Sequence, residues 1–205
     1  MAIIHKQLSE IWEKQFGNDY TDRKLEVHRT EGDLRKKSWS RIFEMVDDVD
    51  SVIEVGCNVG MNLEGIFHAN NSLHITGIEP NKYALKKALK YAQGRYEVLG
   101  GNIFNLSLKH NADMVITCTL LIHISPDQLL SAMNEIYMAS NKYILIMEYY
   151  WPIVKEVNYR GLKEALWKQD YGAKFYNNFD VHLIETGYLD SRDGFDRTTW
   201  WLFKK

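Results

Sequence analysis

Apolar and polar positions fall into blocks along the chain, and the blocks switch between two periods. Short apolar runs typical of buried parallel strands occupy residues 51–55, 73–79, 96–99, 112–118 and 143–147. Stretches with helical spacing separate most of them, and two more apolar runs cover 181–184 and 198–203. This order predicts an α/β fold. We expect a doubly wound, Rossmann-like sheet of seven strands, with helices on both faces and an antiparallel last strand.

Capping residues refine one of the predicted helices. Ser125 is a good N-cap and Pro126 suits the first helical position, so a helix is predicted from there through Tyr137. A further helix is predicted over 162–175, ahead of the last two strands.

The first part of the chain is helical and aromatic. Leu8, Ile11, Trp12 and Phe16 have helical spacing, Gly17-Asn18 is expected to end that helix, and a second helix is predicted over 34–46. We therefore expect residues 1–47 to form an N-terminal helical cap on a core of residues 48–205 that is one compact unit. The segment 19–24 is either a plain cap or a lid, with Tyr20 and Arg23 reaching a ligand.

Composition narrows the function. The chain has 205 residues and a formal net charge of −2, which disfavours a nucleic acid partner. No apolar run reaches membrane-spanning length, and the N-terminus lacks a signal-peptide core. The two cysteines, Cys57 and Cys118, fit reduced thiols and favour a cytoplasmic protein. The seven histidines lack ligand spacing, so no metal site is expected.

The segment S-V-I-E-V-G-C-N-V-G-M, residues 51–61, combines a strand, a glycine turn and a helix start. A dinucleotide fingerprint needs glycine at its first, third and sixth positions, and Asn58 and Met61 break that spacing. The acid-x-Gly-x-Gly-x-Gly pattern fits better and resembles motif I of the S-adenosylmethionine (SAM) methyltransferases, with Asn58 as the middle residue. Asn tolerates positive φ better than most residues, so the turn survives. We expect the cofactor to contact Glu54, Gly56, Cys57, Asn58 and Gly60.

Other predicted strands also end at residues whose side chains suit cofactor binding. Glu79 lies about 20 residues beyond the glycine turn, where a carboxylate accepts hydrogen bonds from both ribose hydroxyls. Asn102 and Ile103 suit the edge and the face of an adenine. Ligands of such sheets bind beyond the carboxyl ends of the strands, so Pro80 and Cys118 are also expected to contact the cofactor.

Two residues near strand ends are candidates for catalysis. His123 has an ordinary pKa of about 6.5, which suits a general base. Glu148 ends a buried strand and is expected to accept a proton, to orient the acceptor, or to pair with Arg160. Tyr149, Tyr150, Trp151 and Tyr159 are expected to form one wall of a sugar or ammonium pocket, with aromatic core packing as the alternative for at least one of them. The predicted substrate-binding residues are therefore Tyr149, Tyr150, Tyr159 and Arg160.

Several segments together resemble one family. These are F-G-N-D-Y-T-D-R, E-V-G-C-N-V-G-M-N-L, L-I-H-I-S-P-D, Y-I-L-I-M-E-Y-Y and V-N-Y-R-G, and they resemble the pseudaminic acid biosynthesis-associated methylases. The resemblance implies a SAM-dependent methyltransferase that acts on a small molecule of a sugar or nonulosonic acid pathway. Lys24 stands where the family pattern has Asn, and Cys118 where it has Lys, so the identity of the acceptor is not transferred.

Alternative functions stay open at this stage. A nucleotide-sugar or dinucleotide enzyme is disfavoured by the glycine spacing. A SAM-binding protein that transfers no methyl group, or a methyltransferase of an unrelated amine or carboxylate, fits motif I equally well. The sequence leaves open the acceptor, whether oxygen or nitrogen is methylated, the need for a base, and the oligomeric state.

Overall fold

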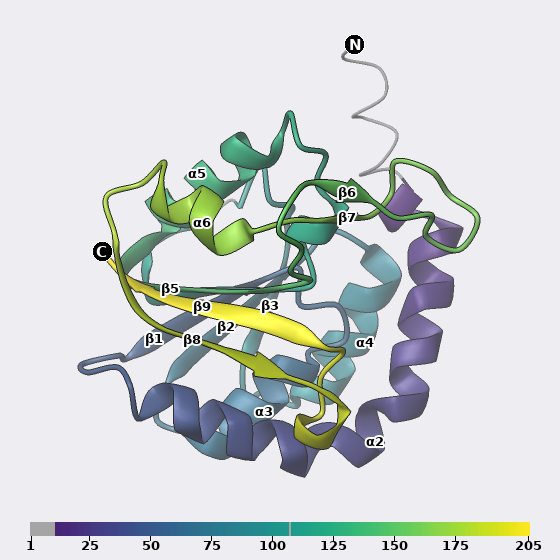
Figure 1. Ribbon diagram of the computed structural model, residues 1–205. Helices are drawn as coiled ribbons and strands as arrows, with labels where there is room; N and C mark the ends of the chain where they lie inside the picture. The colour runs from purple at the N-terminus through teal and green to yellow at the C-terminus, as the bar shows by residue number, and fades with distance from the viewer. Residues whose placement is uncertain (1–10, 107) are drawn as a thin grey trace.

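The computed structural model describes residues 11–106 and 108–205, with the backbone alone for 27–33. Its main sheet has seven strands in the order β3-β2-β1-β4-β5-β9-β8 (Figure 1). The first five in sequence are β1 (Ser51–Val55), β2 (His74–Glu79), β3 (Glu97–Gly100), β4 (Ala112–Cys118) and β5 (Ser140–Glu148). These five are parallel, whereas β9 (Thr198–Lys204) runs antiparallel to both β5 and β8 (His182–Leu189). The predicted sheet is confirmed.

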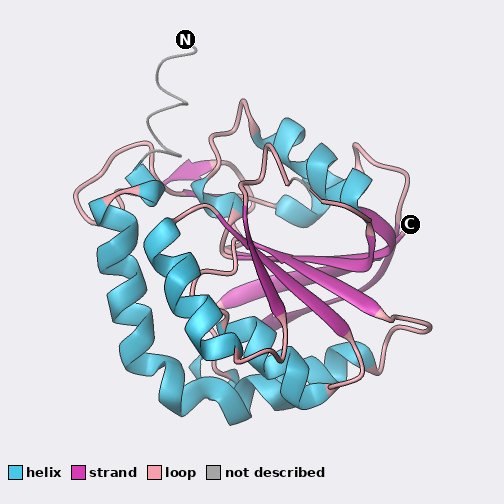
Figure 2. Cartoon of the chain, turned by 180° about the vertical axis from the view of Figure 1, so that it is seen from behind, coloured by secondary structure: helices cyan, strands magenta, loops and turns pink. Residues whose placement is uncertain are grey.

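Helices cover both faces of this sheet (Figures 1 and 2). One apolar core joins the sheet to α2 (Gln15–Phe43), α3 (Met61–Ala69) and α4 (Lys82–Ala92). The opposite core joins it to α5 (Leu129–Ala139) and α6 (Tyr171–Tyr176). The central strands are buried on both sides, which explains why they appear in the sequence as continuous apolar runs.

The N-terminal helix differs from the prediction. Gly17-Asn18 does not end a helix: α2 continues through it, and the N–H of Asn18 bonds to the carbonyl of Lys14 at 3.1 Å. A Cβ at Gly17 would lie 1.8 Å from the carbonyl oxygen of Trp12. Glycine is therefore needed here for close approach of the backbone, not for a stop. Leu8 lies outside the described residues.

Two further boundaries also differ from the prediction. The helix predicted from Ser125 begins only at Leu129, because 126–128 form a turn closed by a 3.0 Å bond from Gln128 N to Ser125 O. In place of the helix predicted over 162–175, the chain forms β7 (Trp167–Lys168), paired with β6 (Lys155–Glu156), and then the short α6. Two short 3₁₀ turns, η1 (Leu121–His123) and η2 (Ser191–Asp193), complete the elements.

The topology places the site. The five parallel strands end at one edge of the sheet, and the chain reverses its direction of winding between β1 and β4. The first half of α2 runs past this edge, and the β6–β7 hairpin lies near its start (Figure 1). Segments that precede and follow the five parallel strands in the sequence thus lie beside the strand tips (Figure 1).

Candidate cofactor and acceptor site

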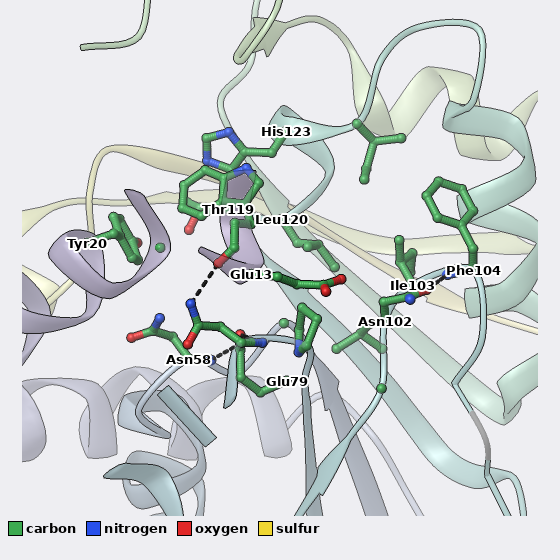
Figure 3. Close-up of a pocket in the computed structure, with 18 of the residues that line it drawn as sticks. Glu13, Tyr20, Asn58, Glu79, Asn102, Ile103, Phe104, Thr119, Leu120 and His123 are labelled. Carbon is green, nitrogen blue, oxygen red and sulfur yellow. Dashed lines mark hydrogen bonds between the residues drawn. The ribbon is translucent and has the colours of Figure 1, made fainter. Parts of the chain in front are cut away.

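Two adjoining cavities open at the carboxyl edge of the sheet. The first is lined by Glu79, Pro80, Asn102, Ile103 and His123, together with Trp12 from the N-terminal segment (Figure 3). The second is lined by Glu54, Cys57, Asn62, Lys24, Asp196 and Thr198. Tyr20, Gly56, Asn58, Cys118 and Thr119 line both cavities. The structure thus brings most of the predicted cofactor-binding residues around one continuous space.

The turn after β1 has the backbone geometry that its sequence predicts. Gly56, Asn58 and Gly60 have φ angles of 78°, 47° and 85°. A Cβ at Gly56 would lie 3.0 Å from Cδ1 of Leu120, so the open space beside this residue depends on glycine. Gly60 is the N-cap of α3 and lies outside the lining of the two cavities.

Glu79 lies at the tip of β2 with its side chain turned to the turn after β1 (Figure 3). Its Oε2 accepts the N–H of Asn58 at 2.8 Å, and its Oε1 accepts the N–H of Asn81 at 2.9 Å. Burial raises the pKa of this carboxyl to about 7, against the lowering effect of the two N–H bonds. Each carboxylate oxygen has a second lone pair, so the group still accepts two hydroxyl donors.

The corner beside Glu79 suits a flat ring. Pro80 and the buried side chain of Ile103 line it, together with Phe104. Asn102 accepts the N–H of Phe104 through Oδ1 at 2.9 Å, which leaves its NH₂ group as the end that donates to a ligand. The contribution of Phe104 was not predicted from the sequence.

Glu54 lies at the back of the second cavity. Its Oε1 accepts Nδ2 of Asn62 at 2.6 Å, and Asn62 in turn accepts a hydrogen bond from Arg35. Oε2 of Glu54 is buried and has no hydrogen-bond partner among the described residues. Burial raises the pKa of this carboxyl to about 7. Such an acceptor fits a ligand that brings a donor.

Cys57 is buried and Cys118 is half-buried, and both are neutral thiols. Burial raises the pKa of Cys118 to about 12 and also raises that of Cys57. Neither therefore acts as a thiolate near neutral pH.

The N-terminal helix brings Lys24 to the second cavity, whereas Arg23, which was expected at the cofactor, lines neither cavity. Cζ of Arg23 lies 5.8 Å from the ring centre of Tyr20, and Nη2 of Arg23 is buried without a hydrogen-bond partner among the described residues. Nζ of Lys24 lies 2.8 Å from Oδ2 of Asp196, in the loop before β9. Lys24 and Cys118, the two departures from the family pattern, thus line the same cavity.

His123 lies at the far side of the first cavity from Glu79 (Figure 3). Its Nδ1 is 2.7 Å from the carbonyl oxygen of Ala165, so Nδ1 carries the proton and Nε2 carries the lone pair. Burial lowers its pKa to about 4, so the ring is neutral at pH 7. Its ring centre lies 4.3 Å from that of Trp12 and 5.3 Å from that of Tyr159.

Glu148 occupies a different position from the one expected. Its side chain is fully buried and lines neither cavity. Its carboxylate accepts three backbone N–H groups, from Leu120 at 3.2 Å, Leu121 at 3.0 Å and Ile122 at 3.3 Å. Burial raises its pKa to about 7. Glu148 therefore fixes the turn that carries His123, which makes it a positioning residue.

The expected pairing of Glu148 with Arg160 is absent from the described part of the chain. Arg160 is exposed, and its Cζ lies 5.9 Å from the ring centre of Tyr159. Tyr159 also packs near Trp12 and Phe16, with ring centres 6.4 and 6.0 Å apart. Tyr150, in contrast, is 45% exposed, and its ring centre lies 6.3 Å from that of Trp201.

Metal sites and membrane spans are two further features that bear on function. The described residues contain no group of three or more His, Cys, Asp or Glu side chains placed to hold a metal ion. Within the same residues, no helix has the length and apolar character needed to cross a membrane.

Comparisons with known proteins agree with this geometry. Residues 52–142 match the model of a family described as a methyltransferase domain. No curated protein sequence matches the chain.

Solved structures share the fold over nearly the whole chain. The 1,6-didemethyltoxoflavin-N1-methyltransferase of Burkholderia thailandensis, with its substrate and S-adenosylhomocysteine bound, is 11% identical with a TM-score of 0.77, over 98% of this chain and 90% of that one. The magnesium protoporphyrin IX methyltransferase of Synechocystis PCC 6803, with SAM bound, is 12% identical with a TM-score of 0.69, over 98% and 96%. The N-terminal domain of EvdMO1, in the presence of S-adenosylhomocysteine and D-fucose, is 14% identical with a TM-score of 0.61, over 83% and 81%. At these identities the likeness concerns the fold.

The match over residues 52–142 identifies a methyltransferase domain, and the fold is one that SAM-dependent methyltransferases share, as the sequence predicted. These solved structures contain SAM or S-adenosylhomocysteine, in agreement with the predicted cofactor. The comparisons support a small-molecule methyltransferase and contain nothing specific to pseudaminic acid.

Proposed function

We propose that the protein transfers a methyl group from SAM to an oxygen or nitrogen of a small molecule of a sugar or nonulosonic acid pathway. The observation that carries the proposal is the pairing of Glu79 with the glycine cradle at Gly56 on one cavity wall. A carboxylate with free lone pairs and a backbone without a side chain together suit a nucleoside ligand.

The chain has residues that suit the ribose, the adenine and the methionine part of SAM. Glu79 would hold the ribose hydroxyls, and Asn102 with Ile103 would take the adenine. Oε2 of Glu54 and Nη2 of Arg23 are both buried without a hydrogen-bond partner among the described residues. The first is an acceptor and the second is a donor. Because the amino acid end of SAM carries an ammonium, Glu54 on the wall of the second cavity suits the methionine part, whereas Arg23 lines neither cavity.

SAM supplies an electrophilic methyl group on its sulfonium sulfur. The chain's task is to bind and orient both reactants, which contributes up to about 7–11 kcal/mol in well-ordered sites. His123 offers the Nε2 lone pair to an O–H or N–H of the acceptor. With its pKa near 4 it is a weak base, so it serves best as a hydrogen-bond acceptor that orients the nucleophile.

The N-terminal residues complete the proposal. Trp12 and Tyr20 line the first cavity, and Asn81 Nδ2 donates to the carbonyl of Trp12 at 2.7 Å. We propose that residues 1–47 act as a lid on the 48–205 core, with Tyr20 and Arg23 on its inner side.

Calorimetric titration tests the cofactor first. SAM and S-adenosylhomocysteine should bind, whereas NAD and a nucleotide sugar should not; binding of NAD alone would overturn the proposal. A mass-spectrometric search for a +CH₂ product among sugar-pathway metabolites then tests transfer. Cofactor binding without any methylated product across amines, carboxylates and sugars would favour a SAM-binding protein that transfers no methyl group.

A further inference from the structure

Three residues on the wall of the second cavity each have a buried side-chain oxygen without a hydrogen-bond partner among the described residues. These oxygens are Oε2 of Glu54 on β1, Oδ1 of Asn58 in the turn after β1, and Oγ1 of Thr198 at the start of β9. Glu54 is 2% exposed and Thr198 is 0% exposed, so bulk water does not serve them. Buried oxygens of this kind indicate a ligand that brings hydrogen-bond donors into the cavity.

The second cavity is small, and its charges are balanced. Its volume is about 50 Å³, which is room for only a few groups of the size of water. Two cations and two acids line it, and one cation, Lys24, is paired with one acid, Asp196, at 2.8 Å. The polarity of the remaining wall therefore depends on the other two charged residues, Glu54 and Arg35.

Asn62 connects these two charged residues. Its Nδ2 donates to Oε1 of Glu54 at 2.6 Å, and its Oδ1 accepts a hydrogen bond from Nη1 of Arg35. A guanidinium group has donors only, so Asn62 must turn its oxygen to Arg35 and its NH₂ group to Glu54. This chain of hydrogen bonds occupies Oε1 of Glu54 and leaves Oε2 for a ligand.

Arg35 and Thr198 belong to elements that meet at this cavity. Arg35 is buried on α2, and its Cζ lies 4.4 Å from the ring centre of Phe195. Phe195 comes three residues before Thr198 and lines the same cavity. The segment that leads into β9 is thus packed against the residue that begins the hydrogen-bond chain to Glu54.

The hydrogen-bond chain also acts on the charge of Glu54. Burial raises the pKa of this carboxyl to about 7 and the charge of Glu79 raises it further, whereas the hydrogen bond from Asn62 and the charge of Arg35 lower it. Because Oε1 accepts a hydrogen bond from Asn62, a proton on this carboxyl would lie on Oε2. Asn62 and Arg35 therefore favour the state in which Oε2 accepts a hydrogen bond.

We infer that Thr198, together with Arg35 acting through Asn62, determines where the second cavity binds the ammonium group of the cofactor's methionine part. This rests on the proposed function and adds residues of α2 and β9 to the cofactor site. An ammonium group has three donors, and the three unpartnered oxygens, Oγ1 of Thr198 among them, receive them. Arg35 and Asn62 are positioning residues, because they act through Glu54.

Two probes isolate the contribution of the ammonium in the whole protein. The first is S-adenosylhomocysteine, and the second is its deaminated analogue, in which a hydrogen atom replaces the ammonium. Calorimetry gives the dissociation constant of each probe, and their ratio measures the preference for the ammonium. A variant with a general structural defect weakens both probes alike and leaves this ratio unchanged, so the ratio reports on the ammonium site alone.

We expect the wild-type protein to bind S-adenosylhomocysteine about ten-fold or more tightly than the deaminated analogue. Thr198→Val keeps the shape of the side chain but removes the oxygen, and Arg35→Met and Asn62→Ala each break the hydrogen-bond chain to Glu54. Each of these variants should lower the preference by about three-fold or more. Arg35→Lys keeps a cationic donor and should retain the preference, as should the control Arg41→Met, which replaces an exposed arginine of α2.

Several outcomes would overturn the inference. They are a wild-type protein that binds both probes equally, an unchanged preference in Thr198→Val or Arg35→Met, and a preference as low in Arg35→Lys as in Arg35→Met. If Arg35→Met binds neither probe, Asn62→Ala decides the positioning role in its place. Failure of S-adenosylhomocysteine to bind to the wild-type protein would instead contradict the proposed function.

Discussion

The backbone N–H of Asn58 donates to Oε2 of Glu79 at 2.8 Å, so one carboxylate ties the turn after β1 to the tip of β2. Asn58 has a φ of 47°, and its place in the turn depends on this left-handed conformation. The residue proposed to hold the ribose thus also holds the turn beside which the ligand lies.

Replacing Glu79 with Gln should weaken the binding of S-adenosylhomocysteine by about 10- to 100-fold. Losing hydrogen bonds to a charged group costs about 1.5–3 kcal/mol, and each 1.4 kcal/mol is ten-fold. Because the pKa of Glu79 is about 7, wild-type affinity should also rise as the pH increases through 7, and the variant should show a smaller rise. Calorimetry at pH 6 and pH 8 measures both effects. Exposed Glu97→Gln serves as the control, and an unchanged dissociation constant in Glu79→Gln would remove Glu79 from the site.

Gly56→Val should abolish cofactor binding while the protein stays folded. A side chain at this position would meet Leu120, with its Cβ 3.0 Å from Cδ1, and would fill the cradle. Gly94→Val is a matched control, because Gly94 has nearly the same φ, +79° against +78°, and a Cβ there would have nothing within 4 Å. Both variants should lower the melting temperature by similar amounts through backbone strain. Calorimetry should then show lost binding in Gly56→Val alone; equal binding in the two variants would place the ligand elsewhere.

The positions of the strands could be predicted from the sequence for a physical reason. Parallel strands buried on both faces are continuous apolar runs, so β1 and β4 were predicted with their observed bounds. The carboxyl ends of parallel strands must share an edge, which brings Glu79, Asn102 and Cys118 to the first cavity. The residues of these strand tips therefore followed from the alternation pattern alone.

The remaining features depend on contacts that no local pattern reveals. Gly17 is typical of a helix end, yet here it admits the carbonyl of Trp12. β6 and β7 have two residues each, too few for any periodicity. A carboxylate at the end of a buried strand suggested chemistry at Glu148, whereas its partners are the N–H groups of a turn 26 to 28 residues earlier. Long-range hydrogen bonds of this kind become visible only in three dimensions.

His123→Asn should lower kcat while leaving the affinity for S-adenosylhomocysteine within a few-fold. The Asn amide can still donate to the carbonyl of Ala165, but it lacks the Nε2 lone pair. If His123 is the base, the loss should be about 10²–10⁴ in rate. The acid limb of the wild-type rate profile should then lie near pH 4, not near 6.5, because the neutral ring is the active form. Rates at several pH values with an identified acceptor measure this; an unchanged kcat would show that the acceptor needs no base.

Glu148→Gln separates the positioning role from a catalytic one through its effect on stability. In the folded protein the pKa of Glu148 is about 7, raised from 4.5 by burial, so the folded state binds this proton more tightly than the unfolded state. The stability that this group contributes is therefore fully present below about pH 4.5 and is lost as the pH rises through 7, on the order of 3 kcal/mol in all. Gln does not titrate, so the difference in unfolding free energy between pH 5 and pH 8 should shrink in the variant, whereas Glu97→Gln should leave it unchanged. At pH 5 the variant should be less stable by about 1–3 kcal/mol, because its single oxygen cannot serve the N–H groups of both Leu121 and Ile122 as the two carboxyl oxygens do. Urea unfolding at the two pH values gives both numbers, and a variant with the full wild-type pH dependence would assign that dependence to other groups.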